Sequence, residues 1–105
     1  MDRITLSNGN SYRVEVNWNA LVAFLETSGR DDVRELANLA TLKPSDLAGL
    51  LAAGIHEGER LEGNEVSFTP EEIGALVDFS TIGEFIGIFT RQTQPKGVKD
   101  DGKKE

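Results

Sequence analysis

The sequence predicts an α+β protein in which a small N-terminal antiparallel β-hairpin packs against about five short α-helices. Two patterns lead to this fold class. Near the start of the chain, apolar and polar residues alternate on both sides of Asn8-Gly9, which is the period of strands with one buried face. From residue 17 onward, apolar residues recur every three or four positions, which is typical of amphipathic helices. Two short strands are not stable alone, so the helices must cover the apolar face of the hairpin.

The pairing of the two strands depends on the length of the loop between them. A two-residue loop would set apolar residues opposite polar ones, which is unfavourable because opposite residues share a face. A three-residue loop over residues 8–10 sets Leu6 opposite Tyr12 and Ile4 opposite Val14. Its last residue, an asparagine, can take the left-handed conformation with which such loops end. We therefore predict the three-residue loop.

The first helix is predicted over residues 18–28. Asn17 is a favourable N-cap, and Gly29 can end the helix in the left-handed conformation. The large apolar residues of this helix fall on one stripe, with Phe24 beside it. They are Trp18, Leu21, Val22 and Leu25.

Two further helices are expected in the middle of the chain. Asp31 can cap the second helix, and Pro44 suits the first turn of the third because its missing N–H is not needed there. The apolar residues are Val33, Leu36, Ala37 and Ala40 in the second helix and Leu47, Leu50, Leu51, Gly54 and Ile55 in the third. Gly58 is the expected end of the third helix, and His56, near that end, is a favourable partner for the helix dipole.

Residues 58–69 are expected to form a loop with a short extended segment, and residues 65–68 could add a third strand to the hairpin. The clearest helix start in the chain follows this loop. Thr69 as N-cap, Pro70 at the first position and Glu72 at the third form a capping box. The inward-pointing residues of this helix are expected to be Ile73, Leu76 and Val77.

The last predicted helix is strongly amphipathic, and Ser80 can cap it. Its apolar residues, at i, i+3, i+4 and i+7, are Ile82, Phe85, Ile86 and Phe89. Residues 1–94 are expected to form a single globular domain. Residues 95–105 have one apolar side chain among eleven, so we expect a mobile charged tail.

Five glycines lie inside the helical patterns, where each costs about 0.5 to 1 kcal/mol relative to alanine unless close packing offsets it. They are Gly49, Gly54, Gly74, Gly83 and Gly87. They indicate either tight packing in a small core or helices that reorganise around a partner.

The chain is acidic and has no cysteine. Of its 105 residues 28% are charged and 38% are hydrophobic, and the net charge is -7. Nucleic-acid binding needs a basic patch and is not expected; the acidic charge serves solubility or steers a basic partner. No apolar run approaches the roughly twenty residues of a membrane span, and the chain start lacks the pattern of a signal peptide. We expect an intracellular protein without disulfides or thiolate metal sites.

The sequence gives no support for an enzyme. His56 is the single histidine, and no nucleophile motif, phosphate-binding loop, dinucleotide fingerprint or calcium loop occurs. The carboxylate pairs lie at helix starts or in the tail, where capping or solvation explains them. They are Asp31-Asp32, Glu71-Glu72 and Asp100-Asp101. We therefore predict no catalytic residue, no cofactor and no metal.

Four segments carry a family resemblance. They are the hairpin Ile4–Val14, the helix Trp18–Gly29, and the segments Leu47–Glu57 and Phe68–Val77. In this order they resemble the small tail assembly chaperones of long-tailed bacteriophages and prophages. The resemblance covers about residues 3 to 90 and rests on patterns of apolar positions and caps.

The resemblance implies a non-enzymatic protein that binds the long helical tape measure protein in the bacterial cytoplasm until the tail tube polymerises around it. It also implies a longer form made by ribosomal frameshifting, through which the tail tube protein could be bound, and Lys103-Lys104 could mark the slippery site. The candidate client-binding residues are Ile82, Phe85, Ile86 and Phe89, which could supply either a groove wall or an intramolecular core.

Two other functions remain open on the sequence. One is a structural tail or neck component that stays in the virion, and the other is a small acidic regulatory protein, such as a DNA mimic, that binds a basic partner. A homo-oligomer is also open, because the hairpin leaves a strand edge that another copy could pair with.

Overall fold

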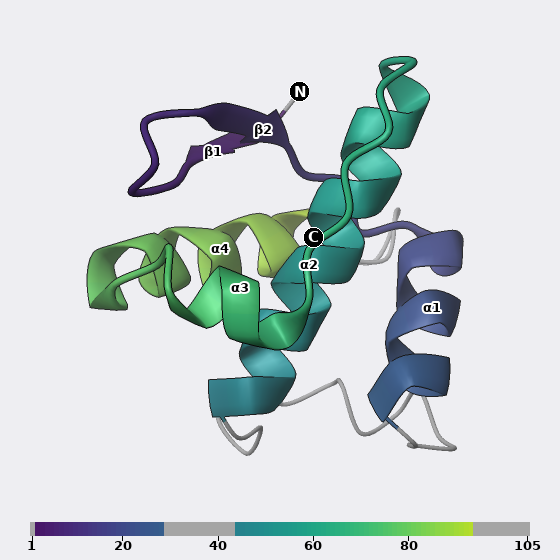
Figure 1. Cartoon of the computed structure of the whole chain (residues 1–105). Coiled ribbons are helices and arrows are strands. Elements are labelled where there is room, and N and C mark those ends of the chain that lie inside the picture. Colours follow the sequence, from purple (N-terminus) through teal and green to yellow (C-terminus); the bar gives the residue numbers. More distant parts are fainter. Residues whose placement is uncertain (1, 29–43, 94–105) are drawn as a thin grey trace, which may run out of the picture.

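The computed structural model describes residues 2–28 and 44–93, and this part of the chain forms an α+β fold (Figure 1). The elements are β1 (Arg3–Thr5), β2 (Ser11–Arg13), α1 (Trp18–Ser28), α2 (Pro44–Leu61), α3 (Pro70–Gly74) and α4 (Phe79–Thr93). In Figure 1, α2 stands in the middle, with α1 on one side and the hairpin and α4 on the other. The helix expected after Asp31 and the tail 95–105 lie outside the described residues. The predicted fold class is confirmed.

The hairpin keeps the predicted faces, but the predicted register is wrong. The structure pairs Ile4 with Tyr12, and the Leu6 amide donates to the Asn10 carbonyl at 3.0 Å. The three-residue loop therefore begins one residue earlier than expected and ends on Gly9, which has a φ of 87°. Glycine takes this conformation without the steric cost that asparagine has. The partner of Ile4 therefore changes from Val14 to Tyr12, a shift of two residues. Because side chains alternate between the two faces of a strand, a shift of two leaves the same side chains facing the core.

The core lies between the hairpin, α2 and α4, and α1 and α3 close its ends. Its buried members are Ile4, Leu6, Val14, Val16, Phe24, Ala48, Leu50, Leu51, Ala52, Ile55, Ile73, Phe85, Ile88 and Phe89. Every described element except β2 contributes at least one of them, and Tyr12 of β2 packs against the cluster. The single cluster makes α2, which supplies five of these residues, the centre of the fold.

The backbone of α2 directly contacts the backbone of the segment that follows β2. It does not end at Gly58, as predicted, but continues to Leu61. A Cβ added at Gly58 would lie 2.6 Å from the Arg13 carbonyl carbon, and one added at Gly54 would lie 3.1 Å from a Val14 methyl carbon. The Glu15 amide also donates to the Gly54 carbonyl at 3.0 Å. Gly58 therefore lies inside the helix and allows the close approach of the hairpin. In the sequence, a glycine with this role looks the same as one that ends a helix.

The remaining glycines inside the helices fall into two groups. A Cβ at Gly49 would make ordinary contacts with Phe24 at 3.4 Å and Pro70 at 3.7 Å. Nothing lies within 4 Å of an added Cβ at Gly74, Gly83 or Gly87. Intramolecular packing therefore explains some of the predicted glycines but not these three.

The predicted third strand is absent, because residues 65–68 form no ladder with the hairpin. Side chains hold this segment instead. The Phe68 ring packs edge-on against Tyr12 with the ring centroids 5.5 Å apart. His56 donates a hydrogen bond from Nδ1 to the Val66 carbonyl at 2.9 Å. The predicted dipole role of His56 is wrong, because α2 continues for more than a turn beyond it.

The caps of α3 and α4 differ in how well the sequence predicted them. Thr69 and Glu72 form the expected capping box. α4 is capped by Asp78 and not by Ser80: the Asp78 carboxylate accepts hydrogen bonds from the Thr81 amide at 2.8 Å and hydroxyl at 2.9 Å. These bonds lower the pKa of Asp78. The start of α4 therefore lies two residues earlier than expected, at Phe79.

A buried carboxylate ties α1 to α2. Glu57 accepts two hydrogen bonds from Arg60, at 2.9 and 2.7 Å, and one from Asn17 at 2.8 Å. Asn17 is also the predicted N-cap, since its Oδ1 accepts the Ala20 amide at 3.0 Å. The Arg60 hydrogen bonds, helped by Asn17 and opposed by burial, lower the pKa of Glu57 to about 2. Asn17 thus caps α1 and ties the start of this helix to Glu57 of α2.

Replacing Gly58 by alanine is expected to destabilise the protein by about 1–3 kcal/mol, because the new methyl group would overlap the Arg13 backbone. Gly74→Ala is the matched control, since its methyl group would meet nothing, and it should be neutral or stabilise by up to about 1 kcal/mol. Urea denaturation measures the free energy of unfolding of both. Equal stability would contradict the close contact between α2 and the hairpin.

The Glu57 carboxylate should make stability depend on pH. Its pKa in the folded chain, about 2, lies below the ordinary 4.5, so its contribution is complete above that ordinary value and is lost as pH falls toward the folded pKa. By about pH 3 the loss should reach about 2 kcal/mol. Glu57→Gln lacks this contribution, so its unfolding free energy should fall by that much less between neutral pH and about pH 3. Parallel pH profiles would refute the linkage.

Candidate protein-binding surface

The four apolar residues predicted to bind a partner lie on one side of α4, but they differ in burial. Phe85 is fully buried and Phe89 is 6% exposed, and their rings contact each other with centroids 6.4 Å apart. Ile82 and Ile86 are half-buried. The structure therefore uses the two phenylalanines as core residues and leaves part of each isoleucine at the surface.

The rotation of α4 is fixed at its C-terminal end by Gln92. This side chain accepts the Val16 amide at 2.6 Å and donates to the Val14 carbonyl at 2.9 Å and to Asp2 at 2.8 Å. It satisfies backbone groups beyond the end of β2, much as a neighbouring strand would. Ile88, which the predicted stripe omitted, is buried together with Phe85 and Phe89.

Next to this buried side, α4 has a side that is partly exposed, and we call it the outer α4 face; Ile82 lies at its edge and also packs against the core. This face is formed by Phe79, Ile82, Gly83, Ile86 and Gly87. Phe79 is 97% exposed, although the helix around it is regular. The two glycines leave the surface beside it without side chains. Residues 79, 82 and 86 are spaced i, i+3 and i+7, which is the spacing with which one helix contacts another.

Sequence reasoning missed Phe79 because it placed the cap at Ser80. A cap at Asp78 makes Phe79 the first residue of the helix and sets the rotation that separates it from Phe85. The signal was present, since aspartate is as good an N-cap as serine. The choice between the two caps decides whether Phe79 belongs to the helix.

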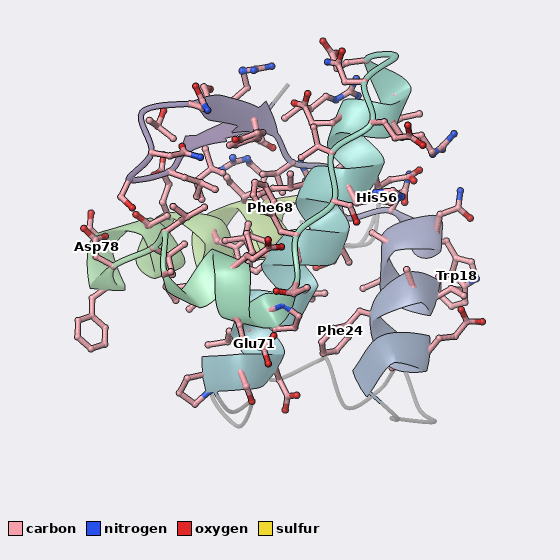
Figure 2. All side chains as sticks on the ribbon, viewed as in Figure 1. Trp18, Phe24, His56, Phe68, Glu71 and Asp78 are labelled. Carbon is pink, nitrogen blue, oxygen red and sulfur yellow. The ribbon has the colours of Figure 1, made fainter. Side chains whose placement is uncertain are left out.

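α1 carries a second exposed apolar surface. Trp18 is 66% exposed and Val22 is 38% exposed, whereas Ala20 and Phe24 are buried. Figure 2 shows Trp18 on the side of α1 that points away from α2, and Phe24 on the side toward α2. Part of the predicted apolar stripe of this helix therefore faces solvent.

The described surface carries an excess of carboxylates. Residues 2–28 and 44–93 contain twelve acidic residues and four arginines. Arg13 pairs with Glu15 and Glu62, and Arg60 pairs with Glu57. Arg91 pairs with Asp2, and the fourth arginine, Arg3, donates to Ser11. All four arginines of the described residues thus bond within the molecule.

Within the described ranges, no group of three or more His, Asp or Glu side chains is placed to hold a metal ion. The helices of this part of the chain are too short or too polar to cross a bilayer. Comparison of the chain with protein-family models, curated proteins and solved structures found no match. The exposed apolar faces and the acidic charge around them are the features of the described residues that could bind a partner.

Phe79→Ser should leave the free energy of unfolding within about 0.5 kcal/mol of wild type, because the ring is almost fully exposed. Phe85→Ala should cost about 3–5 kcal/mol, because it removes a ring from the core. Chemical denaturation of both variants measures the difference. A large loss for Phe79→Ser would show that this ring is part of the core and not of a binding surface.

Proposed function

We propose that this protein is a tail assembly chaperone of a bacteriophage or prophage, and that it binds a helix of the tape measure protein on the outer α4 face. The observation that carries the proposal is the 97% exposure of Phe79 on an ordered helix, next to the half-buried Ile82 and Ile86. Full burial of one such side chain is worth about 1.5–3 kcal/mol. A client helix would supply that burial, and the sequence resemblance points to the same class of client.

The dimensions of α4 suit this role. Its 15 residues correspond to about 22 Å of helix at about 1.5 Å per residue. A long client helix would therefore offer several contact lengths, and several copies of the chaperone could cover it. Acidic residues outnumber arginines threefold in the described part of the chain. Coated clients would consequently repel one another, which opposes aggregation.

The proposal includes the host-cell cytoplasm as the place of action and no enzymatic step. It also includes a second partner, the tail tube protein, reached through a longer frameshifted form. The sequence of the gene tests that extension. A slippery heptamer at the codons of Lys103-Lys104 followed by an overlapping reading frame is the expected finding, and its absence would restrict the proposal to the short form.

The client interaction is tested by co-expression with the tape measure protein of the phage or prophage that carries this gene. The double variant Phe79→Ser, Ile86→Ser should move most of the client to the insoluble fraction, because it removes two of the three apolar contacts. Trp18→Ser is the control, since it removes an exposed apolar ring from α1 and should leave the client soluble. A soluble client with the double variant, or equal losses with both variants, would contradict the assignment of the outer α4 face.

The chaperone is distinguished from a structural tail or neck component by its absence from finished particles. Mass spectrometry of purified virions should detect the tape measure protein but not this chain. A stoichiometric amount of this chain in the particle would overturn the chaperone proposal and favour a structural role.

A further inference from the structure

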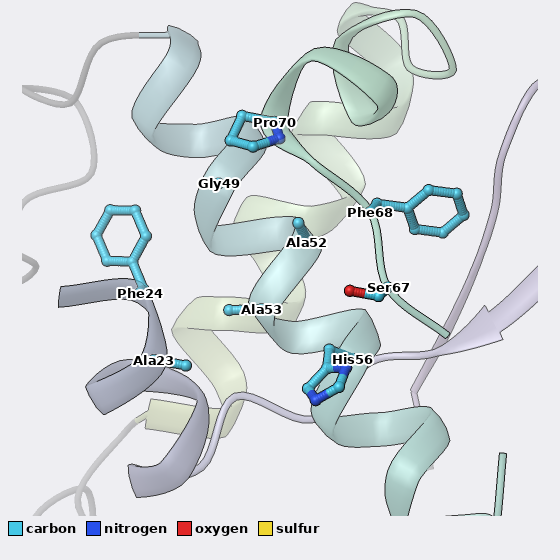
Figure 3. A pocket seen from close by; sticks show the side chains of 9 residues that line it. All are labelled: Ala23, Phe24, Gly49, Ala52, Ala53, His56, Ser67, Phe68 and Pro70. Carbon is cyan, nitrogen blue, oxygen red and sulfur yellow. The ribbon is translucent and has the colours of Figure 1, made fainter. Parts of the chain in front are cut away.

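A groove lies on the side of α2 that faces α1, away from α4. Its floor is formed by three small residues of α2, Gly49, Ala52 and Ala53, and its walls include Phe24 of α1 and Pro70 at the start of α3. Figure 3 shows Phe24 and Pro70 beside the flank of α2 that carries Gly49, Ala52 and Ala53. The groove exists because the floor residues have little or no side chain, so the two walls cannot meet across them.

The size of the groove fits one apolar side chain. Its cavity volume is about 170 Å³, close to the roughly 150 Å³ of an apolar cavity that holds a benzene molecule. The lining is mostly apolar, and its polar groups come from Ser67 and His56. The Nδ1 atom of His56 is already bonded to the Val66 carbonyl. A leucine or phenyl side chain would therefore find apolar contacts along most of the groove.

Among the described residues, two exposed glutamates lie next to residues that line the groove. Glu71 directly follows the Pro70 wall, and Glu26 lies one turn after Ala23, which also lines the groove. Both glutamates are exposed. The arginine nearest in α2, Arg60, is one turn beyond His56 and is paired with Glu57. A segment that carries lysine or arginine beside its apolar side chain matches this charge pattern.

We propose that the groove is a second binding site, which takes one large apolar side chain of a protein segment flanked by lysine or arginine. The site is separate from the outer α4 face, because α1 and α4 lie on opposite sides of α2 (Figure 1). The inference does not require the client of the outer α4 face to be the tape measure protein. In this proposal the acidic residues beside the groove attract the basic segment, in addition to any role in solubility.

Gly49 allows this site to be closed without damage to the fold. A methyl group added there would lie 3.4 Å from the Phe24 ring and 3.7 Å from Pro70, between the two walls. These are ordinary contact distances, and alanine is a better helix former than glycine. Gly49→Ala should therefore narrow the groove while it keeps or raises stability. Ala53→Leu is a larger plug at a half-buried position of the floor.

The test uses a synthetic twelve-residue peptide with one central leucine and lysines on both sides, titrated into the ¹⁵N-labelled full chain. The peptide should change the NMR chemical shifts of the backbone amides of Ala52, Ala53, His56 and Ser67. Gly49→Ala should weaken binding about threefold and Ala53→Leu at least about tenfold. Gly74→Ala, the matched control outside the groove, should leave binding unchanged. A peptide with glutamate in place of lysine should bind at least about tenfold more weakly.

Three results would overturn the inference. They are the absence of shifts in the groove at millimolar peptide, unchanged binding to Ala53→Leu while its amide spectrum shows a folded chain, and equal binding of the glutamate peptide. The first result would also mean that the groove is covered by the chain itself or by a second copy. Phe79→Ser should bind the peptide like wild type, so failure at this groove and failure of the outer α4 face are measured separately.

Discussion

The close approach of the hairpin to α2 at Gly54 and Gly58 is the constraint on which the rest of the structure depends. It lets backbone meet backbone, so the Glu15 amide reaches the Gly54 carbonyl and no side chain at either glycine separates the two elements. The position of the hairpin then determines where Gln92 can bond beyond β2, and through Gln92 it sets the rotation of α4. The exposure of Phe79 is a consequence of this order of contacts.

α2 positions both proposed surfaces. On one flank, α2 packs against the hairpin and α4. The residues of α4 that are not fully buried in this packing form the outer α4 face. On the other flank, Glu57 holds α1 through Asn17, and the small residues of α2 leave the groove between α1 and the start of α3. Two apolar sites on opposite sides of one acidic body are suited to a protein that contacts an extended partner at more than one point.

Local signals could be predicted from the sequence, and tertiary ones could not. The bounds of α1, its Asn17 cap and the capping box of Thr69 depend on residues within one helical turn, and all were predicted correctly. The role of Gly58 depends on its contact with Arg13, which is distant in the sequence. Without that contact in view, Gly58 was predicted to end the helix. The hairpin register and the cap of α4 each depended on a choice between nearby residues of similar propensity, and the structure uses Gly9 and Asp78.

The most direct test of the central claim is site-specific photo-crosslinking in cells that express the chain together with the proposed client, the tape measure protein of the same phage or prophage. A photoreactive phenylalanine analogue placed at Phe79 retains the exposed ring, and one placed at Trp18 samples the exposed face of α1. The account predicts a crosslinked product with the client from position 79 and little or none from position 18. Client crosslinks from position 18 with none from position 79 would contradict the assignment of the outer α4 face as the client-binding surface.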